Sequence, residues 1–313
     1  MTALESIVVA LVSARRARGL DEDEPPLVTA LRDAGAHVTV ADWDDPDVSW
    51  ESFDLAILRS TWDYTDRLQE FLTWVQEVSG LTTLLNPAAV VRWNTDKHYL
   101  AELAERGVPT VPSVFVEPGE DAGAAIDRFL AAHAEPELVV KPAVGAGSRD
   151  TQRHERHSRG SAVAHVQRLL DAKRSVLLQP YLDRVDDYGE TALIFIGGHF
   201  SHAIRKGPML PAGGAGAFSD TTGTAGTGSA ALFVSEKITP RAAATDELEV
   251  AARALAAIPF GSLLYARVDL IRDTRGAPVL LELELTEPSL FFGYAEGSAA
   301  RFAAALCGPF DRP

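Results

Sequence analysis

The chain has 313 residues, a formal net charge of −15 and one cysteine, Cys307. The length suits two or three globular domains, and the single cysteine excludes an internal disulfide and a cysteine-rich zinc site. The negative charge argues against sequence-independent nucleic-acid binding, which needs a positive surface, and against an anionic membrane partner. No apolar stretch reaches the length of a bilayer span, so we expect a soluble, cytoplasmic protein. The sequence is also compatible with a homo-oligomer.

Residues 1–93 alternate between strand-like and helix-like segments. Apolar runs of strand length lie at 6–13, 37–43, 53–60 and 81–87. Helix-like segments that end in glycine signals lie at 25–36 and 66–80. Because this alternation is typical of a parallel sheet, we predict a small N-terminal α/β domain over 1–93.

Residues 94–182 repeat the alternation and predict a second α/β unit. A helix is predicted to begin at Asn94 or Thr95 and to end at Gly107. Further strands are predicted at 111–118, 137–143 and 175–182, with helices at 120–134 and 161–173. The segment HERHSR, residues 154–159, is predicted to be a mobile basic loop, because two histidines without further ligands make a weak zinc site.

Residues 183–313 predict a third unit built on two hairpins. The first, 190–206, turns at Gly197-Gly198, a two-residue turn signal. The segment from Gly207 to Ser229 is rich in Gly, Ala and Thr and is too long for an ordinary connector, so we expect a functional loop. A helix over 239–258, the second hairpin over 264–285 and a helix over 297–308 follow.

The second hairpin carries carboxylates in strands that otherwise resemble buried core. If TRGA, residues 274–277, is the loop and Asp273 faces Pro278, then Asp269 lies across from Glu282. Glu284 shares that face, because side chains alternate along a strand. Like charges that face each other repel, so we expect a cation between them, and Mg²⁺ prefers such oxygen ligands. The alternative is an amphipathic hairpin with a wet acidic face.

Two lysine-containing motifs suggest a phosphate site. In KPAVGAGS a strand ends near Lys141, and a glycine-rich loop follows in which backbone N–H groups can approach phosphate oxygens. A simple glycine turn explains this segment equally well. In NTDK, Lys97 stands near a predicted helix start, where N-capping with a solvated lysine is the alternative.

Two further segments suggest ligand contacts at strand ends. Arg59 stands at the carboxyl end of a predicted strand, where open α/β sheets bind ligands. The residues after it, Ser60, Thr61 and Asp63, could instead cap the next helix. The segment LLQPYLDRVDDYGE runs from an apolar strand into an extended stretch, where backbone groups could hold an adenine and an acid the ribose hydroxyls.

Taken in order, these motifs resemble the ATP-grasp superfamily. The set is the N-terminal α/β domain, NTDK, VVKPAVGAGS, LLQPYL, GE before a hairpin, ARVDL and ELELTEP, and it covers nearly the whole chain. The resemblance implies an α/β (α+β) fold in which two α+β subdomains, 94–182 and 183–313, hold ATP between them. It also implies that Mg²⁺-ATP phosphorylates a carboxylate and that a nucleophile attacks the acyl phosphate.

The same resemblance implies roles for individual residues. The family pattern ends in Glu-x-Asn where this chain has Glu-x-Glu, so the ion would sit in a more negative site. For the nucleotide, the resemblance implies that the phosphates are bound by Lys97 and Lys141 and covered by a loop with Gly145, Gly147 and Ser148, that the γ-phosphate faces Arg267 and that the ribose is bound by Glu190. It implies that the adenine is held by Gln179, Pro180, Tyr181 and Leu182. The implied ligands of Mg²⁺ are Asp269, Glu282 and Glu284.

At a finer level, LRSTWDY, SHAIRKGPM and ELELTEPSLFF resemble the O-ureido-D-serine cyclo-ligases of D-cycloserine biosynthesis. This implies a small amino-acid-like substrate whose own nitrogen closes a ring. Arg59 and Lys206 would flank the substrate carboxylate, with surface charges as the alternative, and Glu287 and Ser289 would hold an amine or ureido nitrogen. An intermolecular carboxylate–amine ligase and a catalytically silent nucleotide-binding module remain alternatives.

Overall fold

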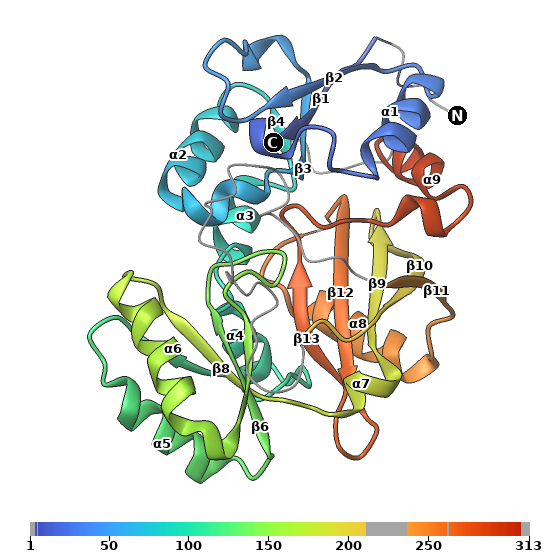
Figure 1. Ribbon diagram of the computed structural model, residues 1–313. Helices are drawn as coiled ribbons and strands as arrows, with labels where there is room; N and C mark the ends of the chain where they lie inside the picture. Colours follow the sequence, from blue (N-terminus) through green and yellow to red (C-terminus); the bar gives the residue numbers. More distant parts are fainter. Residues whose placement is uncertain (1–3, 5, 211–236, 262, 308–313) are drawn as a thin grey trace.

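The N-terminal unit is built on a parallel sheet. The computed structural model describes residues 4, 6–210, 237–261 and 263–307, and within these it contains three sheets (Figure 1). The first has the order β2-β1-β3-β4, and all its neighbours run parallel, as predicted. Its elements are β1 (Val8–Ser13), α1 (Glu24–Asp33), β2 (His37–Asp42), β3 (Leu55–Ser60), α2 (Leu68–Val78), β4 (Thr83–Leu85) and α3 (Ala88–Asn94).

The central unit has an antiparallel sheet of order β5-β8-β6-β7. Helices α5 and α6 pack their apolar residues against it in one core cluster, and Figure 1 shows both on the same side of the sheet. The elements are α4 (Tyr99–Glu105), β5 (Val114–Val116), α5 (Ala122–Ala132), β6 (Glu137–Pro142), β7 (Gln152–Glu155), α6 (Arg159–Asp171) and β8 (Val176–Pro180).

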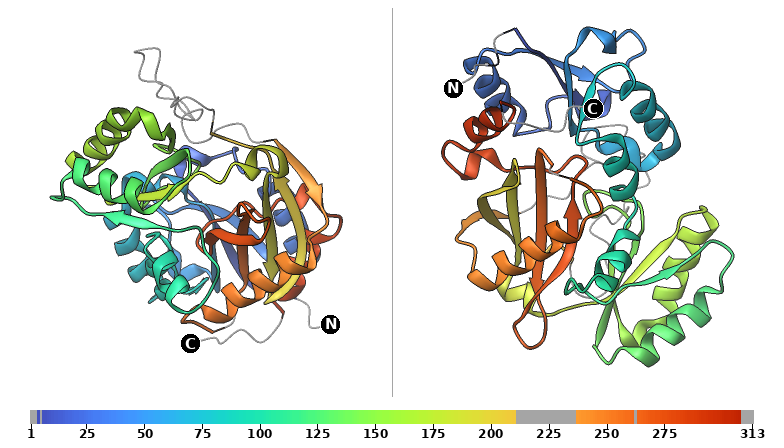
Figure 2. Two further views of the ribbon diagram at one scale, coloured as in Figure 1. Left: turned by 90° about the horizontal axis from the view of Figure 1, so that it is seen from below. Right: turned by 180° about the vertical axis from the view of Figure 1, so that it is seen from behind.

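The third sheet is antiparallel, in the order β11-β10-β9-β12-β13. Helix α8 packs on β12 and β13, whereas α9 packs on α1 of the N-terminal unit, as the right-hand view of Figure 2 shows. The α/β fold class is therefore confirmed. The elements are α7 (Arg184–Tyr188), β9 (Glu190–Ile196), β10 (His199–Lys206), β11 (Ile238–Arg241), α8 (Thr245–Ala257), β12 (Tyr265–Arg272), β13 (Pro278–Glu284) and α9 (Ser298–Ala305).

The prediction that a helix begins at Asn94 or Thr95 is wrong. Asn94 instead ends α3, and a new helix, α4, begins at Tyr99. The Asn94 side chain donates to the Leu283 carbonyl and accepts from the Leu285 amide, at 2.7 Å each. It therefore completes the backbone pairing of β13 instead of capping a helix.

The mobile loop predicted over residues 154–159 is also wrong. His154 lies in β7 and is buried, with its ring nitrogens 3.1 Å from Ser161 Oγ and 3.2 Å from His165 Nδ1. The segment is thus the edge strand of the central sheet followed by a short turn. A smaller correction concerns residues 238–241, which form β11, so that the predicted helix over 239–258 begins only at Thr245.

Residues 211–229 of the predicted functional loop lie outside the described residues. No helix among the residues that are described combines the length and apolarity needed to cross a membrane.

Candidate active site

A cavity of about 620 Å³ lies where the three units meet, and all three contribute to its wall. Tyr64 comes from the N-terminal unit, Lys141 from β6 of the central unit and Asp269 from β12 of the third. Most of the side chains predicted to bind a ligand lie on this wall. The members of the predicted set that line it are Lys97, Lys141, Gly145, Gly147, Ser148, Gln179, Pro180, Tyr181, Leu182, Glu190, Lys206, Arg267, Asp269, Glu282, Glu284, Glu287 and Ser289.

The predicted pairing of Asp269 with Glu282 is confirmed, but the predicted turn is not. Pro278 pairs with Arg272, one residue earlier than expected, so the loop spans residues 273–277. A register shift between Asp269 and Leu270 then adds one residue on β13 and restores the expected pairing. Such bulges re-aim side chains next to functional sites, and this one turns the acidic residues toward the cavity.

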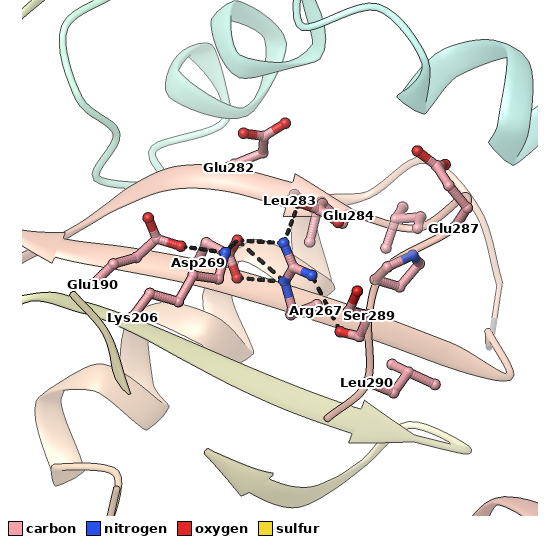
Figure 3. A network of polar contacts seen from close by, with 12 residues as sticks. Glu190, Lys206, Arg267, Asp269, Glu282, Leu283, Glu284, Glu287, Ser289 and Leu290 are labelled. Atoms are coloured by element: carbon pink, nitrogen blue, oxygen red, sulfur yellow. Dashed lines mark hydrogen bonds and ion pairs between the residues drawn. The ribbon is translucent and has the colours of Figure 1, made fainter. Parts of the chain in front are cut away.

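Asp269 lies at the centre of a buried ion-pair network, drawn in Figure 3. Arg267 Nε and Nη2 each donate to an Asp269 oxygen at 2.9 Å, and Lys206 Nζ donates to Oδ2 at 2.7 Å. Arg267 Nη2 also donates to Glu284, while Lys206 lies 2.6 Å from Glu190. Two cations therefore hold three carboxylates together across β9, β10, β12 and β13.

This network sets the protonation of its acids. Burial alone would raise the pKa of Asp269, but Arg267 and Lys206 hold it well below its usual range. Burial raises the pKa of Glu190 to about 8 against the pull of Lys206, and it raises the pKa of Glu284 to about 7 against Arg267. Asp269 therefore stays ionised near neutral pH, whereas Glu190 and Glu284 bind a proton more readily than ordinary carboxyl groups.

Glu282 and Glu284 are the carboxylates best placed to meet a metal. Their side chains are about a quarter exposed, at 26% and 27%, whereas that of Asp269 is 2% exposed and saturated by its cations. In the part of the chain that the structure describes, no three acids or histidines already converge as ligands. Mg²⁺ commonly takes only one or two carboxylates together with substrate phosphates, so this donor set fits that ion in the presence of a nucleotide.

Two lysines approach the hairpin from the central unit and differ in their partners. Lys97 Nζ lies 2.9 Å from Glu282 Oε1 and donates to the Gly145 carbonyl at 2.7 Å. Burial would lower the pKa of Lys97, but Glu282 outweighs that effect and raises it. Lys141 makes no such contact among the described residues, and burial lowers its pKa to about 8. A buried lysine without a direct anionic partner suits a phosphate-bearing ligand.

The glycine-rich loop between β6 and β7 covers one side of the cavity. Gly147, Ser148 and Asp150 all have positive φ, at 60°, 56° and 59°. For the two non-glycine residues this conformation costs on the order of 1 kcal/mol each. Backbone N–H groups in such left-handed turns form concave anion sites, which agrees with the predicted phosphate contact.

The exit of β8 forms another part of the cavity wall. Gln179 donates to Ser113 Oγ at 2.9 Å, and the Tyr181 amide donates to the Glu137 carbonyl at 3.0 Å. Arg153 stacks 3.6 Å above the Tyr181 ring. These contacts fix the backbone of the predicted adenine segment against the central sheet.

Arg59 is not a surface charge. Its side chain is buried, donates to the Pro288 carbonyl at 3.0 Å and lies 3.6 Å from Asp23. It is absent from the cavity wall and supports the segment that carries Glu287 and Ser289. The capping alternative for the residues after Arg59 is also wrong. Thr61 precedes the 3₁₀ turn Trp62–Asp66, but its side chain makes no capping hydrogen bond, and buried Asp63 accepts from Trp43.

Three acids from the N-terminal unit, Asp21, Glu22 and Asp23, line the cavity and were not predicted. Asp23 accepts from the amides of Leu290, Phe291 and Phe292 at 2.6–2.9 Å. Asp21 is buried, and its Oδ2 has no hydrogen-bond partner among the described residues. The run DEDE at 21–24 was the only signal in the sequence, and such runs are usually solvated.

Glu287 completes the acidic end of the cavity. Burial and the nearby Glu284 together raise its pKa to about 8, against the opposing effect of the Tyr64 hydroxyl. In Figure 3 the carboxylates of Glu282 and Glu287 point the same way, away from the Lys206–Asp269 pair. The cavity thus has a cationic end at the two lysines and an acidic end beside the N-terminal unit.

Comparison with known proteins identifies relatives along nearly the whole chain. Residues 9–86 match the family model of the N-terminal domain of D-cycloserine synthetase DcsG. The chain is 42% identical over 308 residues to the cycloserine biosynthesis protein DcsG of Streptomyces lavendulae, covering 96% of this chain and 97% of that protein.

Solved structures agree with this relationship. A crystal structure of D-cycloserine synthetase DcsG superposes with a TM-score of 0.86 at 41% identity, covering 96% of this chain and 98% of that one. A D-alanine–D-alanine ligase from Bacillus anthracis (TM-score 0.68, 14% identity, 97% and 96% coverage) and the ATP-grasp ligase PsnB (0.63, 18%, 97% and 99%) share the fold. The chain therefore belongs to the D-cycloserine synthetase family of ATP-grasp ligases.

Proposed function

We propose that this chain is an ATP-dependent ligase that converts O-ureido-D-serine into D-cycloserine. The observation that carries the proposal is the cavity, which joins two buried lysines and an acidic hairpin to a second group of buried acids. The similarity to a cycloserine biosynthesis protein over 96% of the chain supports the same substrate.

In this reaction the substrate carboxylate attacks the γ-phosphate of ATP, which gives an acyl phosphate and ADP. The ureido nitrogen that is bonded to oxygen then attacks the acyl carbon, and phosphate leaves with the electron pair. Water removes the carbamoyl group as carbon dioxide and ammonia. Because nucleophile and electrophile belong to one molecule, a cavity that holds both in near-attack geometry removes much of the entropic barrier.

The residues of the nucleotide half take the roles that their placement suits. Lys97 and Lys141 bind the phosphates, and Arg267 faces the γ-phosphate from the network around Asp269. Glu282 and Glu284, with Asp269 behind them, would hold Mg²⁺, which neutralises charge on the phosphates when bound. The remaining proposed contacts are the phosphate loop at Gly145, Gly147 and Ser148, the adenine segment Gln179, Pro180, Tyr181 and Leu182, and Glu190 at the ribose.

The acidic end of the cavity suits the nitrogens of the substrate. Glu287 and Ser289 lie there, and the unpartnered oxygen of Asp21 offers a further acceptor for an ammonium group. Lys206 is the cavity cation nearest to Asp269 and can meet the substrate carboxylate. Arg59 acts from behind the wall, by holding Pro288 and Asp23.

ATP turnover is expected to need one organic substrate only. Purified protein with Mg²⁺-ATP and O-ureido-D-serine should release ADP and phosphate, and mass spectrometry should detect D-cycloserine in equal amount. No second amine is required, because the nucleophile is already part of the substrate.

Two other outcomes would decide against the proposal. Strict dependence on a second amino acid, with a dipeptide-like mass, would establish an intermolecular ligase on the same fold. ATP binding without ADP release, for any candidate carboxylate, would establish a catalytically silent nucleotide-binding module.

The affinity for ATP is expected to fall as the pH rises through about 8. In the free protein Lys141 has a pKa of about 8, so it loses its charge above that pH. Bound phosphates favour the charged form and raise this pKa, so binding takes up a proton. Between the two pKa values the affinity should fall by about tenfold per pH unit.

Calorimetry at pH 8.5 in two buffers of different ionisation enthalpy measures this proton uptake. The variant Lys141→Met is the matched control, because it removes the titrating group but keeps the bulk of the side chain. An equal proton uptake in this variant would assign the effect to another residue.

A further inference from the structure

The glycine-rich loop of the central unit contacts the N-terminal unit at two points. Arg149 donates to Asp66 at 2.9 Å and 2.5 Å through its two terminal nitrogens, and to Thr65 Oγ1 at 2.7 Å. Val144, at the other end of the loop, packs against the aromatic cluster that contains Trp62 and Tyr64. A fork-like pair of this kind fixes direction as well as distance.

The same loop is anchored separately within its own unit. Asp150 accepts from Arg168 at 3.0 Å and from Arg174 at 2.5 Å, and Arg174 also donates to the Val144 carbonyl. The base of the loop is thus fixed to α6 and to the segment before β8. Arg149 is the residue that carries its tip across to the neighbouring unit.

The tip is the part of the loop that needs external support. Gly147, Ser148 and Asp150 have left-handed backbone conformations, and such conformations persist where surrounding contacts over-determine them. Ala146, Gly147, Ser148 and Arg149 itself line the cavity. A contact that holds Arg149 therefore also sets the position of the backbone groups next to it.

The partners of Arg149 belong to the substrate side of the cavity. Thr65 and Asp66 end the 3₁₀ turn Trp62–Asp66, in which Trp62 and Tyr64 line the cavity together with Glu287. One short turn therefore bears both the wall of the substrate end and the anchor of the phosphate loop.

We propose that Arg149 is a positioning residue that couples the phosphate loop to the substrate wall through Asp66 and Thr65. With this contact made, the loop holds the nucleotide phosphates and the same turn holds the substrate end, so that the acyl phosphate forms in a site closed to water. The expected effect of this contact on product formation rests on the proposed function, whereas its expected effect on ATP affinity does not.

A double-mutant cycle tests this coupling with Arg149→Met, Asp66→Ala and the combined variant. Asp66 is outside the cavity wall, so it cannot reach a bound nucleotide itself. Each single change should weaken ATP binding in calorimetry by about fivefold, the scale of a well-formed exposed ion pair. The combined variant should lose no more than the larger single loss, because both changes remove one contact.

The ratio of D-cycloserine to ADP gives the second readout. It should be near one in the unmodified protein and fall below about one half in both single variants, since water then competes for the acyl phosphate. Arg16→Ala is the matched control, because Arg16 contacts the same Asp66 carboxylate at 3.4 Å from within the N-terminal unit. It should leave both readouts unchanged.

Two results would overturn the inference. If Asp66→Ala keeps normal ATP affinity while Arg149→Met loses it, then Arg149 contacts the nucleotide directly. If the two losses add in the combined variant, the residues act independently. An unmodified protein that makes no D-cycloserine would refute the proposed function alone, because the cycle on ATP affinity would still stand.

Discussion

Replacing Glu282 with glutamine is expected to lower kcat by at least about 100-fold, the usual cost of losing one electrostatic contact to a reacting group. Glu282 faces the cavity, pairs with Lys97 at 2.9 Å and is a proposed ligand of Mg²⁺. Glutamine keeps the shape but removes the charge on which both contacts depend. The change should be visible in steady-state turnover with saturating ATP and substrate.

The chain should still fold, because the substitution is isosteric, but its melting temperature should fall, since buried Lys97 loses its anionic partner. The half-saturating Mg²⁺ concentration should rise, since a carboxamide offers one neutral oxygen in place of a carboxylate. The control is Glu296→Gln, which removes an exposed carboxylate outside the cavity wall and should leave turnover and Mg²⁺ dependence unchanged. Full activity of Glu282→Gln with unaltered Mg²⁺ dependence would refute the metal assignment.

Lys97→Met and Lys141→Met should each weaken ATP binding by about 1–3 kcal/mol, the scale of a charge-assisted hydrogen bond to phosphate. Their effects on the free protein should be opposite. Lys97→Met leaves Glu282 without its partner and frees the Gly145 carbonyl, so the melting temperature should fall. Lys141→Met removes a buried charge that has no direct partner among the described residues, so the melting temperature should rise at pH 7.

The sign of the Lys141 effect depends on pH. Its folded pKa of about 8 lies below the ordinary value of 10.5, so the unfolded chain binds the proton more tightly. The buried charge therefore costs stability in full below pH 8, and this cost disappears as the pH rises toward 10.5. The gain from Lys141→Met should shrink over the same range. Equal melting temperatures of both lysine variants would contradict the different partners seen here.

The elements with a clear local period could be predicted from the sequence. The strands at 6–13 and 53–60 and the helix at 66–80 correspond to β1, β3 and α2. The acidic pair Asp269–Glu282 was also predicted, although two errors cancelled: the loop is one residue longer than expected, and a bulge on β13 compensates. Neither the loop length nor the bulge has a marker in the apolar pattern.

The errors occur where distant contacts override local signals. Asn94 is a good helix cap by type, but its side-chain amide bonds to residues almost 200 positions away, in β13 and directly after it. Arg59 follows the rule for strand ends but is buried behind Asp23. The contacts of Asp23 with residues 290–292 and of Arg149 with Asp66 were hidden for the same reason, because the units that these contacts join come together only in the folded chain.

The contact between α1 and α9 has a consequence for how the protein is made. Leu27 and Leu31 of α1 share one apolar cluster with Phe302 and Ala303 of α9 and with Ile194 of the third sheet. The ribosome releases α1 and the parallel sheet early, yet the helix that packs on α1 is translated only after the central unit and the third sheet. Until then, the apolar surface of the nascent N-terminal unit that α9 will cover is exposed to solvent. Exposed apolar surface of this kind is what makes growing chains depend on chaperones.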